Sequence, residues 1–109
     1  MVKTVHEPLF SVIINCFNGA KYLKEAINSV YRQDLDDWEI IFWDNRSTDS
    51  SAKIAQSYDK KLKYYKSSVH TNLGEARSNA IEKANGKWLA FLDTDDFWFP
   101  NKLSSQYDC

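Results

Sequence analysis

Short apolar segments alternate with amphipathic segments along most of the chain, and this alternation limits the folds it can adopt. Four segments rich in β-branched and aromatic residues are typical of strands. They span residues 10–14, 38–43, 62–66 and 88–92. Apolar residues recur at helical spacing in the segments between them and after the last one. Helices are therefore expected at residues 21–33, around 54–58, at 76–84 and at 100–106. A strand followed by a helix, three times in succession, predicts an α/β fold: a mostly parallel sheet of about four strands with helices on both faces.

The fourth predicted strand, Trp88–Leu92, is expected to be buried, and it ends abruptly in Asp93-Thr94-Asp95-Asp96. Three carboxylates within four residues repel one another unless a divalent cation lies among them. Hard oxygen ligands with room for water suit Mn2+ or Mg2+. The alternative is a solvated loop whose aspartates cap the next helix.

Polar loops follow three of the predicted strands, at residues 15–19, 44–49 and 93–97. Ligands of open parallel sheets bind at the carboxyl ends of the strands, so these loops are expected to meet and form the site. Asp44 follows the second strand directly and can accept hydrogen bonds from a base or ribose, or cap the following turn.

Composition narrows the class of protein. The chain of 109 residues has room for one domain, residues 1–109. Its 14 basic and 15 acidic residues argue against a nucleic-acid-binding protein. No apolar stretch is long enough to span a membrane, and the first residues are too polar for a signal peptide. Cys16 and Cys109 are not expected to form a disulfide, which fits a cytoplasmic protein.

Several common motifs are absent. The sequence has neither a G-x-G-x-x-G nor a G-x-x-x-x-G-K-[ST] pattern, which excludes dinucleotide-binding and P-loop interpretations. His6 and His70 are isolated and no zinc-binding pattern occurs. His70 is expected to be an ordinary loop residue.

Six segments together resemble the successive signatures of family 2 glycosyltransferases, in order and spacing over about residues 9–106. They are Ser11–Asn18, Tyr22–Gln33, Trp43–Asp49, Asn72–Arg77, Ala84–Gly86 and Phe91–Leu103. The resemblance implies the GT-A fold, whose N-terminal half is a Rossmann-like nucleotide-binding sheet. It also implies that the chain is the donor-binding part of a larger enzyme.

The resemblance further implies roles for individual residues. Asn15 would line the nucleotide pocket, Asp44 would contact the base, and Arg77 would lie near the diphosphate. Asp93 and Asp95 match the family's D-x-D pair, in which the last aspartate holds the metal, Mn2+ or Mg2+, and the first lies near ribose or metal. Asp96 is a further metal-ligand candidate.

One departure from the family pattern stands out. Asn45 and Arg46 replace the more common Asp and Gly. An arginine at this position could alter contacts with the base or the phosphates.

The implied activity is transfer of a sugar from a nucleotide-diphosphate sugar, with a UDP-sugar expected. The acceptor would be a hydroxyl of a glycan, a lipid-linked molecule or another compound in polysaccharide biosynthesis, and the anomeric centre would be inverted. The general base is expected beyond Cys109. The expected location is the cytoplasm or the inner face of the membrane, with self-association through the last strand and Phe97, Trp98 and Phe99.

Two alternatives remain open at the level of sequence. One is a HAD-like Mg-dependent phosphatase, although that pattern prefers Thr or Val where Phe97 stands. The other is a non-catalytic nucleotide-sugar-binding module.

Overall fold

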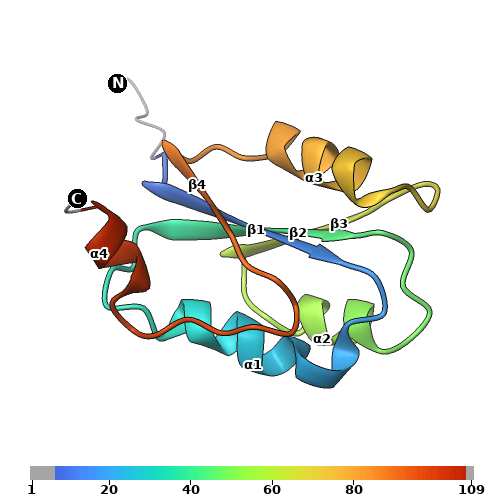
Figure 1. The fold of residues 1–109 in the computed structure, drawn as a ribbon, viewed down its shortest axis with the longest axis horizontal. Coiled ribbons are helices and arrows are strands. Elements are labelled where there is room, and N and C mark those ends of the chain that lie inside the picture. The colour runs from blue at the N-terminus through green and yellow to red at the C-terminus, as the bar shows by residue number, and fades with distance from the viewer. Residues whose placement is uncertain (1–6, 108–109) are drawn as a thin grey trace, which may run out of the picture.

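Figure 1 shows one twisted sheet with helices on both sides, and the computed structural model describes residues 7–107. The elements in chain order are β1 (Phe10–Cys16), α1 (Ala20–Tyr31), β2 (Trp38–Asp44), α2 (Ser51–Gln56), β3 (Leu62–Lys66), α3 (Leu73–Glu82), β4 (Trp88–Phe91) and α4 (Lys102–Tyr107). All strand pairs are parallel, in the order β3-β2-β1-β4. The predicted α/β class and parallel four-stranded sheet are therefore confirmed. No helix within residues 7–107 is long and apolar enough to cross a membrane.

The two central strands, β1 and β2, supply both layers of the core. Successive side chains of a strand point to opposite faces of the sheet. Ile14 and Phe42 pack on the face covered by α1 and α2, whereas Ile13 and Ile41 pack under α3. Because the strands are parallel, the β1–α1, β2–α2 and β3–α3 loops gather at one edge of the sheet (Figure 1). The segment after β4 leaves from the same edge, because β4 is parallel to β1. The three loops predicted to form the site, at residues 15–19, 44–49 and 93–97, therefore all begin at this carboxyl edge.

Both central strands run further than the sequence pattern predicts. β1 continues through Asn15 to Cys16, and β2 includes Asp44. The two ends are paired in register, Asn15 with Trp43 and Cys16 with Asp44. The longer ladders decide which face of the sheet each polar side chain occupies.

Cys16 is a buried free thiol at the end of β1. Burial raises its pKa, so the group stays protonated and packs as a small apolar side chain. The predicted absence of a disulfide with Cys109 concerns a residue outside the described part of the chain.

Gln33 ties the segment after β4 to the end of α1. The helix ends at Tyr31 rather than at the predicted Gln33. The Gln33 amide donates to the backbone oxygen of Phe99 at 2.7 Å and accepts from the backbone N–H of Leu103 at 3.0 Å. The last helix begins at Lys102, not at the predicted Pro100. This clamp fixes the path of the acidic segment that leaves β4.

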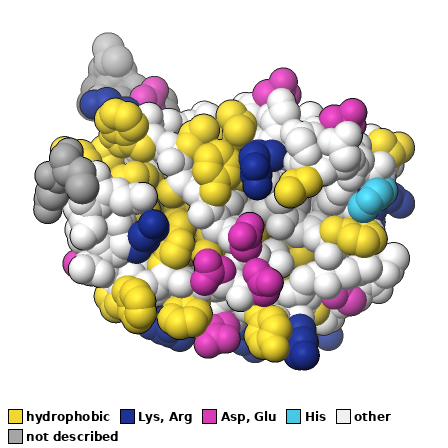
Figure 2. All heavy atoms as spheres, viewed as in Figure 1, with side chains coloured by type: hydrophobic (Ala, Val, Ile, Leu, Met, Phe, Trp, Pro, Cys, Tyr) yellow, Lys and Arg dark blue, Asp and Glu magenta, His cyan; other side chains and the backbone are white. Residues whose placement is uncertain are grey.

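The prediction that strand Trp88–Leu92 is buried is wrong for most of its length. Within residues 7–107, β4 is an edge strand that pairs only with β1, and α3 covers β1 and β2 instead. Trp88 is 57% exposed, and Leu89 and Phe91 are exposed as well, while Ala90 and Leu92 are buried. Hydrophobic side chains accordingly gather on the surface over β4 (Figure 2).

A buried polar network holds the turn that precedes β4. Glu39 is 3% exposed and accepts hydrogen bonds from Ser11 Oγ at 2.6 Å and from the backbone N–H of Asn85 at 2.7 Å, besides its ion pair with Lys63. Burial alone would raise the pKa of this carboxyl, but these hydrogen bonds hold it below its usual value. The backbone N–H of Gly86 donates to Ser11 Oγ at 2.7 Å. The turn that enters β4 is thus held against β1.

Candidate functional site

Asn18 joins the loops that follow β1 and β2. Its side-chain oxygen accepts hydrogen bonds from the backbone N–H groups of Thr48 at 2.7 Å and Asp49 at 3.2 Å. Its own N–H donates to Ser47 Oγ at 2.9 Å. Asn18 has φ 53°, a left-handed conformation that asparagine tolerates better than most residues. No role in the site was predicted for Asn18, although it ends the first family signature and Asn-Gly after a strand is a turn signal.

A cavity of about 500 Å³ lies between the β1–α1 loop and the segment after β4. We call it the acidic cavity. It is lined by Asn15, Phe17, Asn18, Gly19, Lys21, Tyr22, Asp93, Thr94 and Asp95. Acidic side chains gather over this part of the surface (Figure 2). The structure therefore brings together three predicted site residues, Asn15, Asp93 and Asp95. Cavities of similar size beside α4 are lined by aromatic and polar residues and carry no carboxylate.

The close approach of the two segments depends on Gly19. A Cβ atom at this position would lie 2.7 Å from Thr94 Oγ1, which is closer than such atoms pack. The acidic segment itself turns back at residues 93–96, where the N–H of Asp96 donates to the carbonyl of Asp93 at 3.1 Å. Glycine at position 19 thus allows the turn to rest against the start of α1.

The carboxylates of Asp93 and Asp95 are suited to share a cation with a ligand. Both residues are exposed, and their carboxylates have no hydrogen-bond or ion-pair partner among residues 7–107. No group of three His, Cys, Asp or Glu side chains in this part of the chain could hold a metal ion by itself. Mg2+ is usually bound by one or two carboxylates together with substrate phosphates and water. The two carboxylates therefore fit a cation that would also be coordinated by the phosphates of a ligand.

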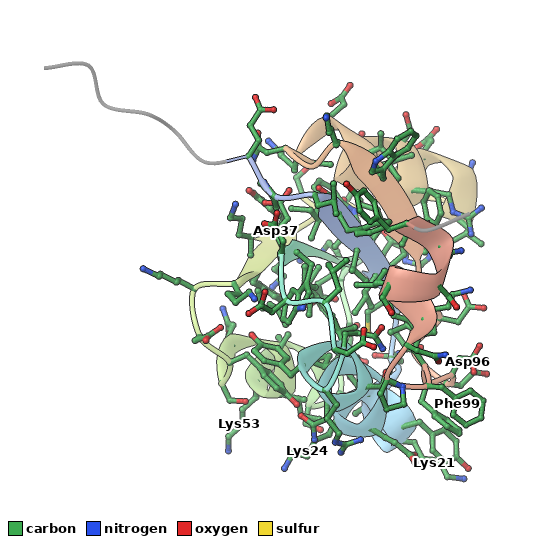
Figure 3. The ribbon with its side chains drawn as sticks, turned by 90° about the vertical axis from the view of Figure 1, so that its left-hand side faces the viewer. Lys21, Lys24, Asp37, Lys53, Asp96 and Phe99 are labelled. Atoms are coloured by element: carbon green, nitrogen blue, oxygen red, sulfur yellow. The ribbon has the colours of Figure 1, made fainter. Side chains whose placement is uncertain are left out.

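Asp96, the third predicted metal ligand, stays outside this arrangement. Its Oδ1 accepts a hydrogen bond from the N–H of Phe97 at 2.8 Å, and it does not line the acidic cavity. Figure 3 shows Asp96 and Phe99 at the outer surface of the segment after β4. The carboxylate of Asp96 therefore serves the local turn.

A second cavity, of about 250 Å³, adjoins the first on the α3 side. We call it the Asn45 cavity. It is lined by Asn15, Cys16, Phe17, Asn45, His70, Thr71, Asn72, Leu73 and Ala76. Asn15 and Phe17 line both cavities. The side-chain oxygen of Asn15 is buried and has no hydrogen-bond partner within the described residues. Because a buried polar atom without a partner is costly, this oxygen marks a place where a ligand would supply a donor.

Asp44 lies in neither cavity. It is fully buried, on the face of the sheet that carries Phe42, two residues earlier in β2. Its Oδ1 accepts from the N–H of Ser47 at 2.8 Å, and its Oδ2 accepts from the hydroxyl of Tyr64 at 2.6 Å. Burial and this hydrogen bond raise the pKa of Tyr64. Asp44 thus stabilises the turn after β2, and the predicted contact with a base would require its burial to be broken.

Arg77 also lies apart from both cavities. It is an exposed residue of α3, and its guanidinium lies 5.4 Å from the ring centroid of Phe91. It lines neither the acidic cavity nor the Asn45 cavity. The predicted contact with a diphosphate stays a prediction.

Arg46 has φ 68°, in the left-handed region where a residue with a Cβ atom is strained by about 1 kcal/mol. Replacing Arg46 with glycine should therefore raise the free energy of unfolding. The gain should be about 0.5 kcal/mol, since glycine also makes the unfolded chain more flexible. The contact that is lost, from Arg46 Nη1 to the Ser67 carbonyl at 3.4 Å, is weak. Urea denaturation measures the change.

The matched control for this variant is Arg46→Ala, which removes the same side-chain contact but keeps a Cβ atom in the left-handed region. We expect the glycine variant to be more stable than the alanine variant by about 0.5 kcal/mol, after the same allowance for the flexibility of glycine in the unfolded chain. Equal stability of the two variants would show that the backbone at residue 46 is not strained.

A family model described as glycosyl transferase family 2 matches residues 11–108 of this chain. Among curated relatives, a putative teichuronic acid biosynthesis glycosyltransferase, TuaG of Bacillus subtilis, is 35% identical over 105 residues. WfgD of Escherichia coli, named as a UDP-Glc:alpha-D-GlcNAc-diphosphoundecaprenol beta-1,3-glucosyltransferase, is 32% identical over 99 residues. These alignments cover 94% and 90% of this chain, but only 42% of TuaG and 39% of WfgD.

Among solved structures, S. aureus TarS matches with a TM-score of 0.85 and 31% identity. The match covers 91% of this chain and 31% of the TarS chain. TarS has also been solved in complex with UDP and with UDP-GlcNAc. These matches give no support to the phosphatase alternative. The chain belongs to glycosyl transferase family 2, and its sheet is the Rossmann-like part of a GT-A fold.

Proposed function

We propose that this chain binds a nucleotide-diphosphate sugar at the carboxyl edge of its sheet. The diphosphate would occupy the acidic cavity and the nucleoside the adjoining Asn45 cavity. The observation that carries the proposal is Asn15, whose buried, partnerless oxygen lies where the two cavities meet. The complexes of TarS with UDP and UDP-GlcNAc support a UDP-sugar as the donor.

A divalent cation, Mn2+ or Mg2+, fits between Asp93, Asp95 and a bound diphosphate. Without it, two carboxylates with no partner would face the negative charge of the donor. When bound, such a cation offsets the charge that builds on a leaving diphosphate. The role of this chain would be to hold the donor and orient it. Asn15, at the junction of the two cavities, and the acidic segment after β4, which Gln33 holds in place, would do this.

The reaction we propose for the full-length protein is displacement of the nucleoside diphosphate by an acceptor hydroxyl, with inversion of the sugar carbon. No residue among 7–107 is placed as the general base, and the chain spans less than half the length of TuaG and WfgD. A hydroxyl on a glycan or a lipid-linked molecule fits as the acceptor, since WfgD is named for a lipid-linked acceptor. The cytoplasm or the inner face of the membrane stays the expected location.

Isothermal titration calorimetry of UDP into the chain tests the proposal. Binding should be about 10-fold tighter or more with Mn2+ than with EDTA, as loss of a charge-assisted interaction predicts. Equal affinity in the two buffers would contradict the metal site, and no binding in either would contradict the function. Product analysis with UDP-sugars and the full-length protein then separates a transferase from a non-catalytic binding module.

The exposed apolar surface over β4 predicts self-association. The outer edge of β4 has no strand partner in the described part of the chain, and Trp88, Leu89 and Phe91 are exposed beside it. Free strand edges with apolar side chains tend to pair with another chain. We expect light scattering to detect dimers that the variant Leu89→Lys disrupts.

The control is Leu73→Lys, because Leu73 is 59% exposed on α3, away from the β4 edge. This variant should associate like the unaltered chain. A monomer at high protein concentration would contradict the prediction, as would equal loss of association in both variants.

A further inference from the structure

The Asn45 cavity contains few free hydrogen-bond acceptors for a nucleobase. The two oxygens of Asp44 are already used outside it. The side-chain oxygen of Asn45 accepts from the N–H of Thr71 at 2.9 Å and from its hydroxyl at 3.3 Å. The Asn45 amide nitrogen donates to the carbonyl of Thr71 at 2.6 Å. Asn45 therefore holds the β3–α3 loop in place and leaves base recognition to other groups.

His70 lies in that loop and lines the cavity. Its Nδ1 is 3.0 Å from the backbone oxygen of Asn45. A carbonyl oxygen can only accept, so Nδ1 carries the proton, and in the neutral ring Nε2 is then an acceptor. The imidazole also packs against Phe17, with ring centroids 4.4 Å apart. These two contacts fix both the orientation and the tautomer of the ring, as in other histidines that donate one nitrogen to a carbonyl.

We propose that His70 Nε2 selects the nucleobase by accepting a hydrogen bond from a ring N–H. Uracil carries such a donor at N3. Cytosine has an acceptor at the same position, so it would place two acceptors opposite each other. This inference rests on the proposed function, because it assumes that the nucleoside occupies the Asn45 cavity. It assigns to His70 the base contact that the sequence predicted for Asp44.

Discrimination between the two bases should be measurable. His70 is exposed in the free chain, so the preference would come from the hydrogen bond gained with uracil and from the two acceptors that cytosine would bring face to face. UDP and CDP have the same ribose and diphosphate and differ only at the edge of the base. We expect UDP to bind about 10-fold tighter than CDP, corresponding to one hydrogen bond.

The test is titration of UDP and CDP, with Mn2+ at pH 8, into the unaltered chain and into His70→Phe. Phenylalanine keeps an aromatic ring beside Phe17 but has no acceptor. We expect UDP affinity to fall about 10-fold and CDP affinity to change little, which removes the preference. N3-methyl-UDP removes the donor from the ligand instead. It should bind the unaltered chain about as weakly as UDP binds the variant.

The outcomes separate this inference from the proposed function. If UDP binds and His70→Phe keeps the preference for UDP, the inference is overturned and the donor site stands. If N3-methyl-UDP binds the unaltered chain as tightly as UDP, the inference falls even if the variant does not fold. If no nucleoside diphosphate binds the unaltered chain, the proposed function falls and the inference with it. A GDP affinity that also drops in the variant would support the same contact, since guanine has a ring N–H at N1.

Discussion

Replacing Gly86 with alanine is expected to lower the free energy of unfolding by about 3 kcal/mol. A Cβ atom at this position would lie 2.5 Å from the backbone nitrogen of Ser11 and 2.7 Å from the backbone carbon of Phe10. These atoms belong to or directly adjoin the central ladder of β1, so they cannot move aside cheaply. The substitution should also loosen the hydrogen bond from the Gly86 N–H to Ser11 Oγ. Urea denaturation followed by circular dichroism measures the loss.

Gly74→Ala is the matched control for this prediction. Gly74 lies in the first turn of α3, and its added Cβ atom would meet only the Asn72 side-chain oxygen, at 3.4 Å. Alanine is favoured over glycine in helices by up to about 1 kcal/mol, so this variant should be as stable as the unaltered chain or slightly more so. Similar destabilisation by both substitutions would contradict the special role of Gly86.

Asp95→Asn is expected to weaken UDP binding in the presence of Mn2+ by about 10-fold or more, which is the whole gain that Mn2+ gives the unaltered chain and lies within the range of losses at metal sites. The amide is close to the carboxylate in size but lacks its charge, so the fold should be kept. In EDTA the variant should bind UDP no more weakly than the unaltered chain does, because it presents one negative charge fewer to the diphosphate. Calorimetry in both buffers gives the four affinities needed.

Asp96→Asn controls for the general effect of removing a negative charge from the segment. Asp96 is next to Asp95 but caps the N–H of Phe97 and lies outside the lining of the acidic cavity. The affinity of the Asp96→Asn variant for UDP with Mn2+ should stay close to that of the unaltered chain. Equal losses in both variants would mean that bulk charge, and not a ligand at Asp95, controls binding.

The topology could be predicted because it depends on a pattern repeated along the whole chain. Apolar strands alternating with amphipathic helices leave few ways to cover a parallel sheet. The convergence of Asn15, Asp93 and Asp95 follows from the same argument, since the carboxyl ends of parallel strands share an edge. The family motifs indicate the chemistry of that edge, which the arrangement of strands and helices does not.

The sequence left two roles open for Asp44, a contact with the base or capping of the following turn, and the choice between them depends on where a strand ends. β2 continues to Asp44, so the alternation of side chains places its carboxylate under α2 with Phe42. Asn45, one residue later, lies beside the cavity instead. His70 was unpredictable for a related reason. Its contacts with Phe17 and Asn45 join segments that are more than 20 residues apart.

The exposure of β4 could not be predicted from its local sequence either. Trp88-Leu89-Ala90-Phe91 resembles a buried strand in composition, yet its neighbours in space decide its burial. α3 packs on β1 and β2 and leaves most of β4 uncovered. The role of Gln33 also depends on neighbours far away in the sequence. Its spacing predicted a place in α1, but its amide bonds to the backbone of Phe99 and Leu103 after the helix has ended.

The central claim is that a nucleoside diphosphate and a divalent cation bind together at the carboxyl edge of the sheet. Paramagnetic broadening of backbone amide signals by substoichiometric Mn2+, measured with and without UDP, tests both the place and the coupling. Residues 15–19 and 93–96 should broaden most, and more strongly when UDP is present. Asp37 directly precedes β2 at the opposite edge of the sheet (Figure 3) and serves as an internal comparison. Strongest broadening around residues 34–39, or broadening that UDP does not change, would contradict the account.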